Sequence, residues 1–259
     1  MTDSGSLILY DISSPLQPRS YAPNPSKARL ALSFKSVLFT TTWVDILDIP
    51  NVRKGLNCPA TRSFDDGSDF FTLPILQNGG EVVGDSFDIA NYLEDTFPGS
   101  GGCLFPLEST RTGLDYESPN KDMLFLVPLT SREEGKNNDY ARFNVQVDVT
   151  FTAYVGLVAE FLPFNLDTTE ATRAVFLKRA RLDSWDKLSI RGGEREEMKA
   201  AFKTGLTSLA QLFMVHESGP YLEGKETNYA DLIVGGWLNM LSATMPQEEI
   251  CSFPPCFSQ

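Results

Sequence analysis

A proline within an apolar, strand-like segment is the first feature of the sequence that suggests a binding site. Pro74 interrupts the run of residues 70–76 (FFTLPIL). A proline removes a backbone donor from a sheet, so it is confined to edge strands or to special geometries. If the Leu73-Pro74 bond is cis, the Leu73 N–H and C=O groups turn outward and can pair with a peptide-like ligand. An edge-strand proline without a ligand is an equally good interpretation of this residue alone.

A second feature follows at Gly84-Asp85-Ser86, just before a segment with helical spacing. The N-terminus of a helix offers unpaired N–H groups and partial positive charge, which favour an anion. We expect Ser86 to hold a carboxylate through its amide and hydroxyl, while Asp85 accepts from an ammonium group. Together they would recognise the free end of an amino acid. The alternative is that Asp85 only caps the helix.

The balance of charge and the scarcity of metal-binding residues exclude several classes of function. Lys and Arg total 22 against 34 for Asp and Glu, a net charge of −12. Such a surface repels phosphate backbones and anionic lipids, so we expect neither nucleic acid nor a membrane as a partner. The four cysteines form no CxxC pair, and the single histidine, His216, is expected at the surface or at a helix end. No metal site is expected.

The N-terminus shows no pattern typical of a secretory signal, and no apolar stretch reaches the roughly 20 residues needed to cross a bilayer. A cytoplasmic location is therefore the expectation.

Strand and helix patterns alternate in the first hundred residues. Asn24 is expected to cap a helix that has Pro25 at its first position and runs to about Lys35. Asp85 is expected to open a second helix. The strand predictions cover residues 6–12, 38–46, 70–76 and 81–83, with irregular chain and a short helix in residues 51–68.

The rest of the chain has helix-type patterning only. We expect helices in residues 141–161, 169–188, 195–216 and 229–241, and a loop or disordered tail in residues 246–259. The predicted division is a first domain at residues 1–98, a linker and insertion at 99–140, a helical domain at 141–245 and the tail.

The proline and the helix start together resemble the glutathione site of the cytosolic glutathione transferases. Residues 20–29 (SYAPNPSKAR) and 43–45 (WVD) are most similar to the fungal and bacterial etherase-type group. The resemblance implies a thioredoxin-like N-terminal α/β domain followed by an all-helical domain. It also implies that Leu73, next to Pro74, contacts the cysteinyl backbone of glutathione, and that Asp85 and Ser86 contact its γ-glutamyl end.

Two further matches follow from the resemblance. Residues 228–233 (NYADLI) look like the capping box that starts the buried core helix of the family. The glycyl carboxylate of glutathione would be held by a basic side chain. The candidates, each of which is alternatively a solvated surface charge, are Lys27, Arg53, Lys54 and Arg62.

The chain departs from the etherase-type motif at Ala22, where that group usually has a serine that donates to the glutathione sulfur. A thiol with a pKa of about 8.5 reaches 7 with roughly 2 kcal/mol of preference for the thiolate. One hydrogen bond to an anion supplies about 1.5–3 kcal/mol, and a helix N-terminus supplies about 0.3–1 kcal/mol, or up to about 2 when partly buried. The Ser26 hydroxyl is one of the groups that could donate. Asn24 at the tip of the first helix is the preferred candidate, with the hydroxyls of Tyr21 and Ser20 as rivals; Asn24 acting only as a cap is the alternative.

The resemblance implies a glutathione-dependent enzyme acting on a small hydrophobic electrophile. Conjugation, thiolytic ether cleavage, and cis-trans isomerisation of a conjugated alkene by reversible thiolate addition are all open, the last being the chemistry of polyene isomerisation in a fungal pseurotin-type pathway. A non-catalytic glutathione-binding or regulatory protein is the alternative, which Ala22 favours. The sequence leaves the oligomeric state open, with a homodimer as one possibility. The pocket for the second substrate is expected between the domains, lined by residues 13–23 and by helices in residues 140–164. Four aromatic residues of those helices would either face the pocket or form core: Phe143, Phe151, Tyr154 and Phe161.

Overall fold

The computed structural model describes residues 7–106, 113–125, 127–130 and 135–251. Its first part is a four-stranded sheet with the order β2-β1-β3-β4. Strand β1 runs parallel to β2 and antiparallel to β3, and β3 runs antiparallel to β4. The strands are β1 (Leu7–Ile12), β2 (Phe39–Val44), β3 (Ile75–Asn78) and β4 (Glu81–Val83). This mixed sheet confirms the predicted thioredoxin-like domain.

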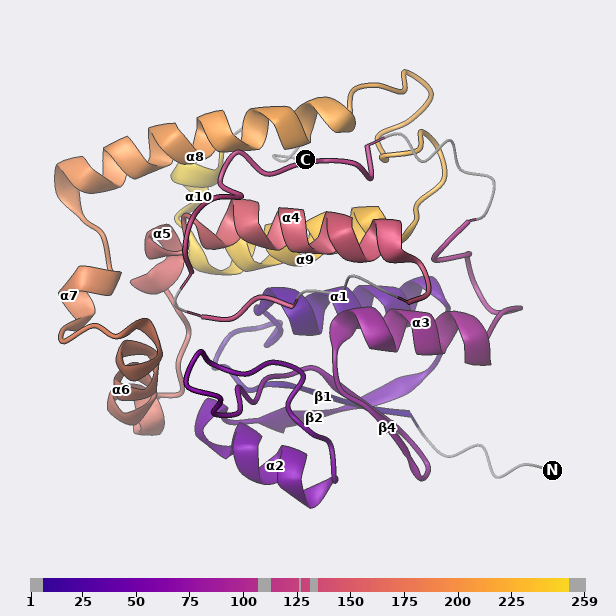
Figure 1. Ribbon diagram of the computed structural model, residues 1–259, viewed down its shortest axis with the longest axis horizontal. Coiled ribbons are helices and arrows are strands. Elements are labelled where there is room, and N and C mark those ends of the chain that lie inside the picture. The colour runs from indigo at the N-terminus through magenta and orange to yellow at the C-terminus, as the bar shows by residue number, and fades with distance from the viewer. Residues whose placement is uncertain (1–6, 107–112, 126, 131–134, 252–259) are drawn as a thin grey trace.

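Helices form layers on the sheet (Figure 1). Helices α1 (Pro23–Phe34) and α3 (Ser86–Thr96) cover the face that is turned toward the helical part, and α2 (Ile49–Gly55) lies on the other side of the sheet. Above them lie α4 (Asn138–Thr152) and α9 (Tyr229–Thr244), with α8 (Gly192–Leu212) outermost. The remaining short and peripheral helices are η1 (Ile46–Asp48), α5 (Gly156–Ala159), η2 (Leu166–Thr168), α6 (Thr169–Ala180), α7 (Trp185–Leu188) and α10 (Gln247–Ile250).

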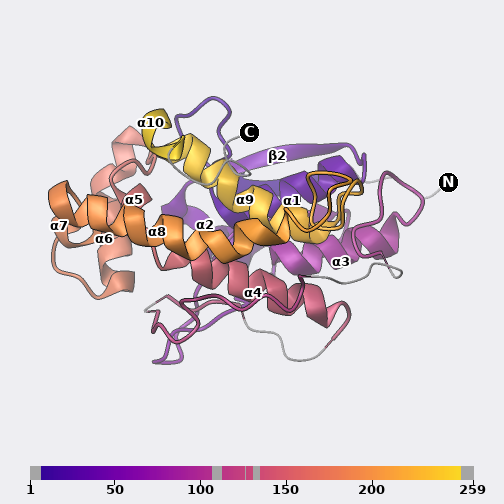
Figure 2. The same cartoon turned by 90° about the horizontal axis from the view of Figure 1, so that it is seen from above.

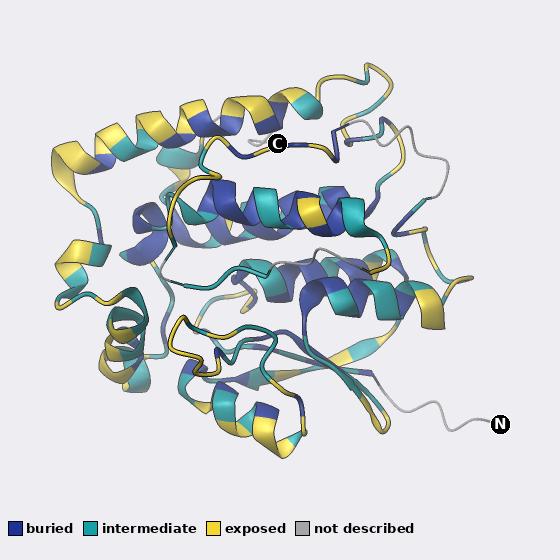
Figure 3. Cartoon of the chain, in the orientation of Figure 1, coloured by how far each residue is buried: buried dark blue, intermediate teal, exposed yellow. Residues whose placement is uncertain are grey.

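One hydrophobic core extends from the sheet into the helical part. It joins Leu9 and Leu32 of the first part to Phe143 and Ile233 of the second, and all four side chains are fully buried. Helices α4 and α9 are mostly buried along their length, whereas α8 exposes its outer side (Figure 3). Figure 2 shows α9 lying along α1 in the view from above. This continuous core marks no boundary between the two parts. The domain limits at residues 98 and 141 therefore stay a proposal.

Helix α9 begins with the capping box that the sequence predicts. The Asn228 side chain accepts from the Ala230 N–H at 2.8 Å, and Asp231 accepts from the Asn228 N–H at 2.8 Å. Gly236 allows α9 to approach α1 closely, since a Cβ there would lie 2.7 Å from the Pro23 carbonyl oxygen. The helix thus supports the tip of α1 directly.

Helix α1 begins earlier than predicted. Its N-cap is Ala22, with no side-chain cap, and Pro23 takes the first helical position that the prediction gave to Pro25. Either proline satisfies the same rule, because a proline at the start of a helix loses no hydrogen bond. The alternative role of Asn24 as the cap is therefore wrong.

Strand β3 and helix α2 also differ from their predicted limits. Strand β3 begins at Ile75, after Pro74, and residues 70–74 are not in a strand because Pro74 offers no N–H to a neighbour. Helix α2 starts at Ile49, before the irregular stretch in which it was expected.

Two predicted long helices are interrupted. Residues 153–155 separate α4 from α5, and Arg181, in the left-handed conformation, ends α6 before α7. The predicted tail includes the short helix α10, while residues 252–259 lie outside the described residues. His216 lies in the turn after α8, as expected for a helix end. No helix in the described part of the chain combines the length and apolar character that a bilayer crossing demands.

Candidate functional site

A mainly apolar cavity of about 470 Å³ lies between the sheet domain and the helical part. The first turn of α1 and residues 70–73 form one side, and α4, α5, α6 and α9 contribute the other. Residues from the described part of the insertion also line it. Its apolar lining includes Ile12, Leu73, Phe125, Leu162, Phe176 and Trp237. A cavity of this size and character fits a small hydrophobic molecule.

The predicted cis bond between Leu73 and Pro74 is present. Leu73 lines the cavity, and neither its N–H nor its C=O group forms a hydrogen bond within the described residues. Most buried backbone groups are paired, so a free donor and acceptor at a cavity wall suit a bound extended peptide.

Asp85 and Ser86 lie at the start of α3, beside the cavity and not in its wall. One oxygen of Asp85 accepts from the Phe87 N–H at 2.9 Å, which is the capping role considered above. Its other oxygen lies 3.4 Å from the hydroxyl oxygen of Thr130, in the insertion. Ser86 is buried at 3% exposure. The second oxygen thus takes part in a contact with the insertion.

Arg53 donates to the backbone beside both predicted glutathione contacts, Leu73 and Asp85. Its role therefore differs from the predicted one, which was to bind the glycyl carboxylate. Its guanidinium is fully buried and donates to backbone carbonyls on both sides of the site. The acceptors are the carbonyl oxygens of Cys58, Pro59, Thr72 and Gly84. Thr72 precedes Leu73 and Gly84 precedes Asp85, so Arg53 positions both. Its donors are used inside the protein, and it does not present them to a ligand carboxylate.

Lys27 also differs from its predicted role, because its ammonium group has partners inside the protein. Its Nζ lies 2.5 Å from an Asp148 carboxylate oxygen and donates to the Asn144 side chain at 2.8 Å. Trp237 Nε1 donates to the same oxygen of Asp148 at 2.7 Å. Burial lowers the pKa of Lys27, while the attraction of Asp148 opposes that shift. The pair joins α1 to α4, and Trp237 adds α9; Asp148 and Trp237 also line the cavity.

Of the other two basic candidates for the glycyl carboxylate, Arg62 lines the cavity and Lys54 does not. Lys54 is exposed, and its Nζ lies 5.5 Å from the Phe71 ring centroid. Arg62 lines the cavity and donates to the Thr72 hydroxyl at 3.2 Å and to the Pro128 carbonyl at 2.9 Å. Its buried Nε has no hydrogen-bond partner within the described residues.

The tip of α1 offers a single free backbone donor. Pro23 and Pro25 carry no N–H, and the Ser26 N–H donates to the Ala22 carbonyl at 3.1 Å. The Asn24 N–H has no hydrogen-bond partner among the described residues, and Asn24 lines the cavity together with Ala22. The partial positive charge of the helix is therefore presented at Asn24.

The two rival hydroxyls lie in different surroundings. Tyr21 lines the cavity, and burial, followed by the charges of Asp11 and Asp45, raises its pKa well above the ordinary value. Its phenol therefore stays protonated and remains a donor. Ser20 does not line the cavity; its carbonyl accepts from Asn239 at 3.2 Å, and its hydroxyl lies 3.4 Å from that of Ser26.

The sequence predicted the location of the cavity and part of its lining. Tyr21, Ala22 and Pro23 of the expected loop line it, and so does the expected helical stretch, residues 140–164, through α4 and α5. The four aromatic residues predicted from that stretch do not line the cavity. Phe143 and Phe151 are core residues. The helical part instead contributes Phe176 and Arg179 from α6, within a basic stretch, residues 178–181 (KRAR), that was visible in the sequence but carried no motif.

Comparison with known proteins agrees with this architecture. Residues 21–96 match the family model described as the glutathione S-transferase N-terminal domain. A glutathione S-transferase-like protein of Aspergillus flavus, ustS, is 25% identical over 253 residues, covering 92% of this chain and 81% of that protein.

Two solved structures share the fold along most of the chain. Glutathione transferase GSTFuA3 from Phanerochaete chrysosporium has a TM-score of 0.72 and 24% identity, covering 93% of this chain and 86% of that one. A glutathione S-transferase of Ceriporiopsis subvermispora, CsGST63524, solved in complex with glutathione, has a TM-score of 0.72, 22% identity and the same coverage. The chain therefore has the glutathione transferase fold, and its residues 21–96 are similar to the glutathione S-transferase N-terminal domain.

Proposed function

We propose that the chain binds glutathione along the edge of the sheet between the tips of α1 and α3. The observation that carries the proposal is the backbone of Leu73, a residue that lines the cavity and whose N–H and C=O groups have no partner among the described residues. Leu73 would pair with the cysteinyl part of glutathione as an added strand does. Ser86 and the second oxygen of Asp85 would hold the γ-glutamyl end, and Arg62 would bind the glycyl carboxylate through its free Nε.

The sulfur of glutathione bound in this way would lie near Asn24. The Asn24 N–H and the helix dipole stabilise an anion there, and the protonated phenol of Tyr21 is a second donor on the same wall. We infer that these groups lower the thiol pKa, so that the proton leaves to solvent and the thiolate remains. Such a mechanism requires no histidine base, and His216 does not line the cavity.

The thiolate would attack a small hydrophobic electrophile held in the apolar cavity. Conjugation or thiolytic ether cleavage consumes glutathione, with a new carbon–sulfur bond and, in thiolysis, departure of an alkoxide or phenoxide. In isomerisation, the thiolate adds to a conjugated alkene and the electron pair passes into the conjugated system. After rotation about the resulting single bond, the pair returns, the carbon–sulfur bond breaks and glutathione is released unchanged. A cytoplasmic homodimer acting in fungal secondary metabolism is the setting we propose.

Replacing Ser86 with alanine tests the glutathione site. Removing the hydroxyl leaves the pairing of the γ-glutamyl carboxylate incomplete, so the Ser86→Ala variant should bind glutathione more weakly by about 1–3 kcal/mol. Isothermal titration calorimetry measures the change, with Ser33→Ala, at an exposed position on α1, as the control. Equal affinity of the Ser86→Ala variant and the wild type would show that the γ-glutamyl end binds elsewhere.

A further inference from the structure

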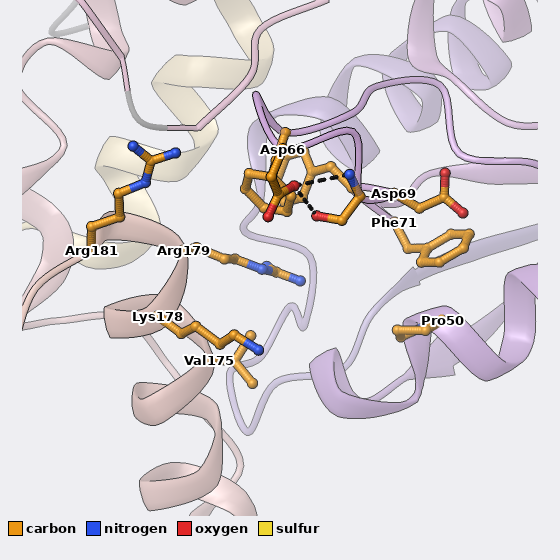
Figure 4. A pocket seen from close by; sticks show the side chains of 11 residues that line it. Pro50, Asp66, Asp69, Phe71, Val175, Lys178, Arg179 and Arg181 are labelled. Atoms are coloured by element: carbon orange, nitrogen blue, oxygen red, sulfur yellow. Dashed lines mark hydrogen bonds between the residues drawn. The ribbon is translucent and has the colours of Figure 1, made fainter.

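Arg179 lies where the helical part meets the loop before β3, and it borders two cavities. It contributes to the apolar cavity and to a neighbouring cavity of about 340 Å³. Figure 4 shows its side chain extending from α6 into the smaller cavity, toward the loop that carries Asp66 and Asp69. Its guanidinium carbon lies 5.0 Å from the centroid of the Phe70 ring and 6.0 Å from that of Phe176. Two aromatic rings thus fix the position of this cation.

No acidic side chain in the described part of the chain pairs with Arg179. Asp66 accepts from the Ser68 amide and hydroxyl, and the neighbouring Asp65 pairs with Arg181 at 3.5 Å. Among the described residues, the guanidinium of Arg179 contacts the Phe70 and Phe176 rings. In a chain with a net charge of −12, a half-buried guanidinium that lacks a carboxylate is an unexpected arrangement.

The neighbouring charge that acts on the pKa of Arg179 is another cation, Arg62. The Arg62 guanidinium carbon also lies 5.0 Å from the Phe70 ring centroid, so one ring contacts both arginines. Burial, together with repulsion by Arg62, lowers the pKa of Arg179 to about 10. Arg62 forms no ion pair among the described residues either, although the charges of Asp85 and Asp148 attract it. An anion bound between the domains would relieve this repulsion and supply the missing partners.

We propose that Arg179 binds a negatively charged group, such as a carboxylate, on the second substrate, whose apolar conjugated body fills the adjoining cavity. The substrate class is therefore an apolar acid and not a neutral hydrocarbon. This inference deepens the proposed function and rests on it, with Arg62 serving glutathione and Arg179 serving the substrate. The other source of a carboxylate is the glycyl end of glutathione, and the experiment separates the two.

The test compares parinaric acid, a fluorescent conjugated tetraene carboxylic acid, with its methyl ester, using the full chain without glutathione. We expect the Arg179→Gln variant to bind the acid about tenfold more weakly, because the charge partner is lost, and to bind the ester as the wild type does. The matched control is Lys178→Gln, an exposed neighbour on α6 that lines only the smaller cavity. It should leave both affinities unchanged, and Arg179→Lys should retain part of the preference for the acid.

Three results would overturn the proposal. If Arg179→Gln weakened the acid and the ester equally, Arg179 would serve only to pack the cavity wall. If neither affinity changed, the guanidinium would bind no substrate anion. If instead Arg179→Gln reduced the calorimetric affinity for glutathione and left parinarate binding intact, the anion would be the glycyl carboxylate. A wild-type protein that bound the acid but not glutathione would contradict the proposed function and leave the role of Arg179 intact.

Discussion

Replacing Arg53 with methionine is expected to destabilise the protein by about 3–5 kcal/mol and to weaken glutathione binding at least tenfold. The substitution keeps a long apolar side chain but removes the donors to four backbone carbonyls, which are buried or partly buried. Each buried acceptor left without a partner costs about 1–3 kcal/mol, and part of that cost is relieved by relaxation of the loop. The Thr72 and Gly84 carbonyls lie next to the proposed contacts, so stability and binding should fall together.

Urea unfolding and calorimetry measure these two effects, with Lys54→Met as the control. Lys54 is the exposed neighbour of Arg53, so its replacement should change stability by no more than about 0.5 kcal/mol. Arg53→Lys should resemble Arg53→Met, because one ammonium group cannot reach acceptors spread around a planar guanidinium. Wild-type stability and affinity in Arg53→Met would refute the positioning role.

Replacing Asp148 with leucine is expected to cost about 3–5 kcal/mol of stability, because it leaves the charge of Lys27 buried without a partner. Lys27 has no exposed surface, and the Trp237 indole would lose its acceptor as well. The double variant Lys27→Met/Asp148→Leu should recover most of the loss, since it removes the unpaired charge.

The penalty of the single variant should decrease as the pH rises. Burial lowers the pKa of Lys27 in the folded state, so the unfolded chain binds more protons between that value and the ordinary lysine pKa. Stability therefore rises with pH across that interval. Urea unfolding at several pH values measures this dependence. An Asp148→Leu variant as stable as the wild type, or a double variant as unstable as the single one, would contradict the account of this ion pair.

Local signals predicted the parts of the fold and site that depend on neighbouring residues. The cap at Asp85, the capping box at Asn228 and the cis bond before Pro74 each follow from a few adjacent residues, and the structure contains all three. Those signals are short in range, so they are readable without knowledge of the tertiary contacts.

The roles of the charged residues were not predictable in the same way. Lys27 and Arg53 have the same appearance in the sequence as a surface lysine or a ligand-binding arginine. Their partners lie far along the chain, with Asp148 more than a hundred residues after Lys27. Arg179 was missed for the converse reason, because its distinguishing feature is the lack of an acidic partner in the folded structure. Only the tertiary arrangement distinguishes these cases.

The thiol pKa of bound glutathione is the most direct test of the central claim, that the tip of α1 holds a thiolate. Ultraviolet titration of thiolate absorbance should give a pKa near 7 in the wild type, against about 8.5 for the free thiol. Asn24→Ala should raise that value more than Tyr21→Phe does, and Ser20→Ala should leave it unchanged, because Ser20 does not line the cavity. If Tyr21→Phe or Ser20→Ala alone restored the free value while Asn24→Ala did not raise it, a hydroxyl donor would replace the helix tip. A bound thiol with the pKa of free glutathione in the wild type would contradict catalysis itself and indicate a ligand-binding protein.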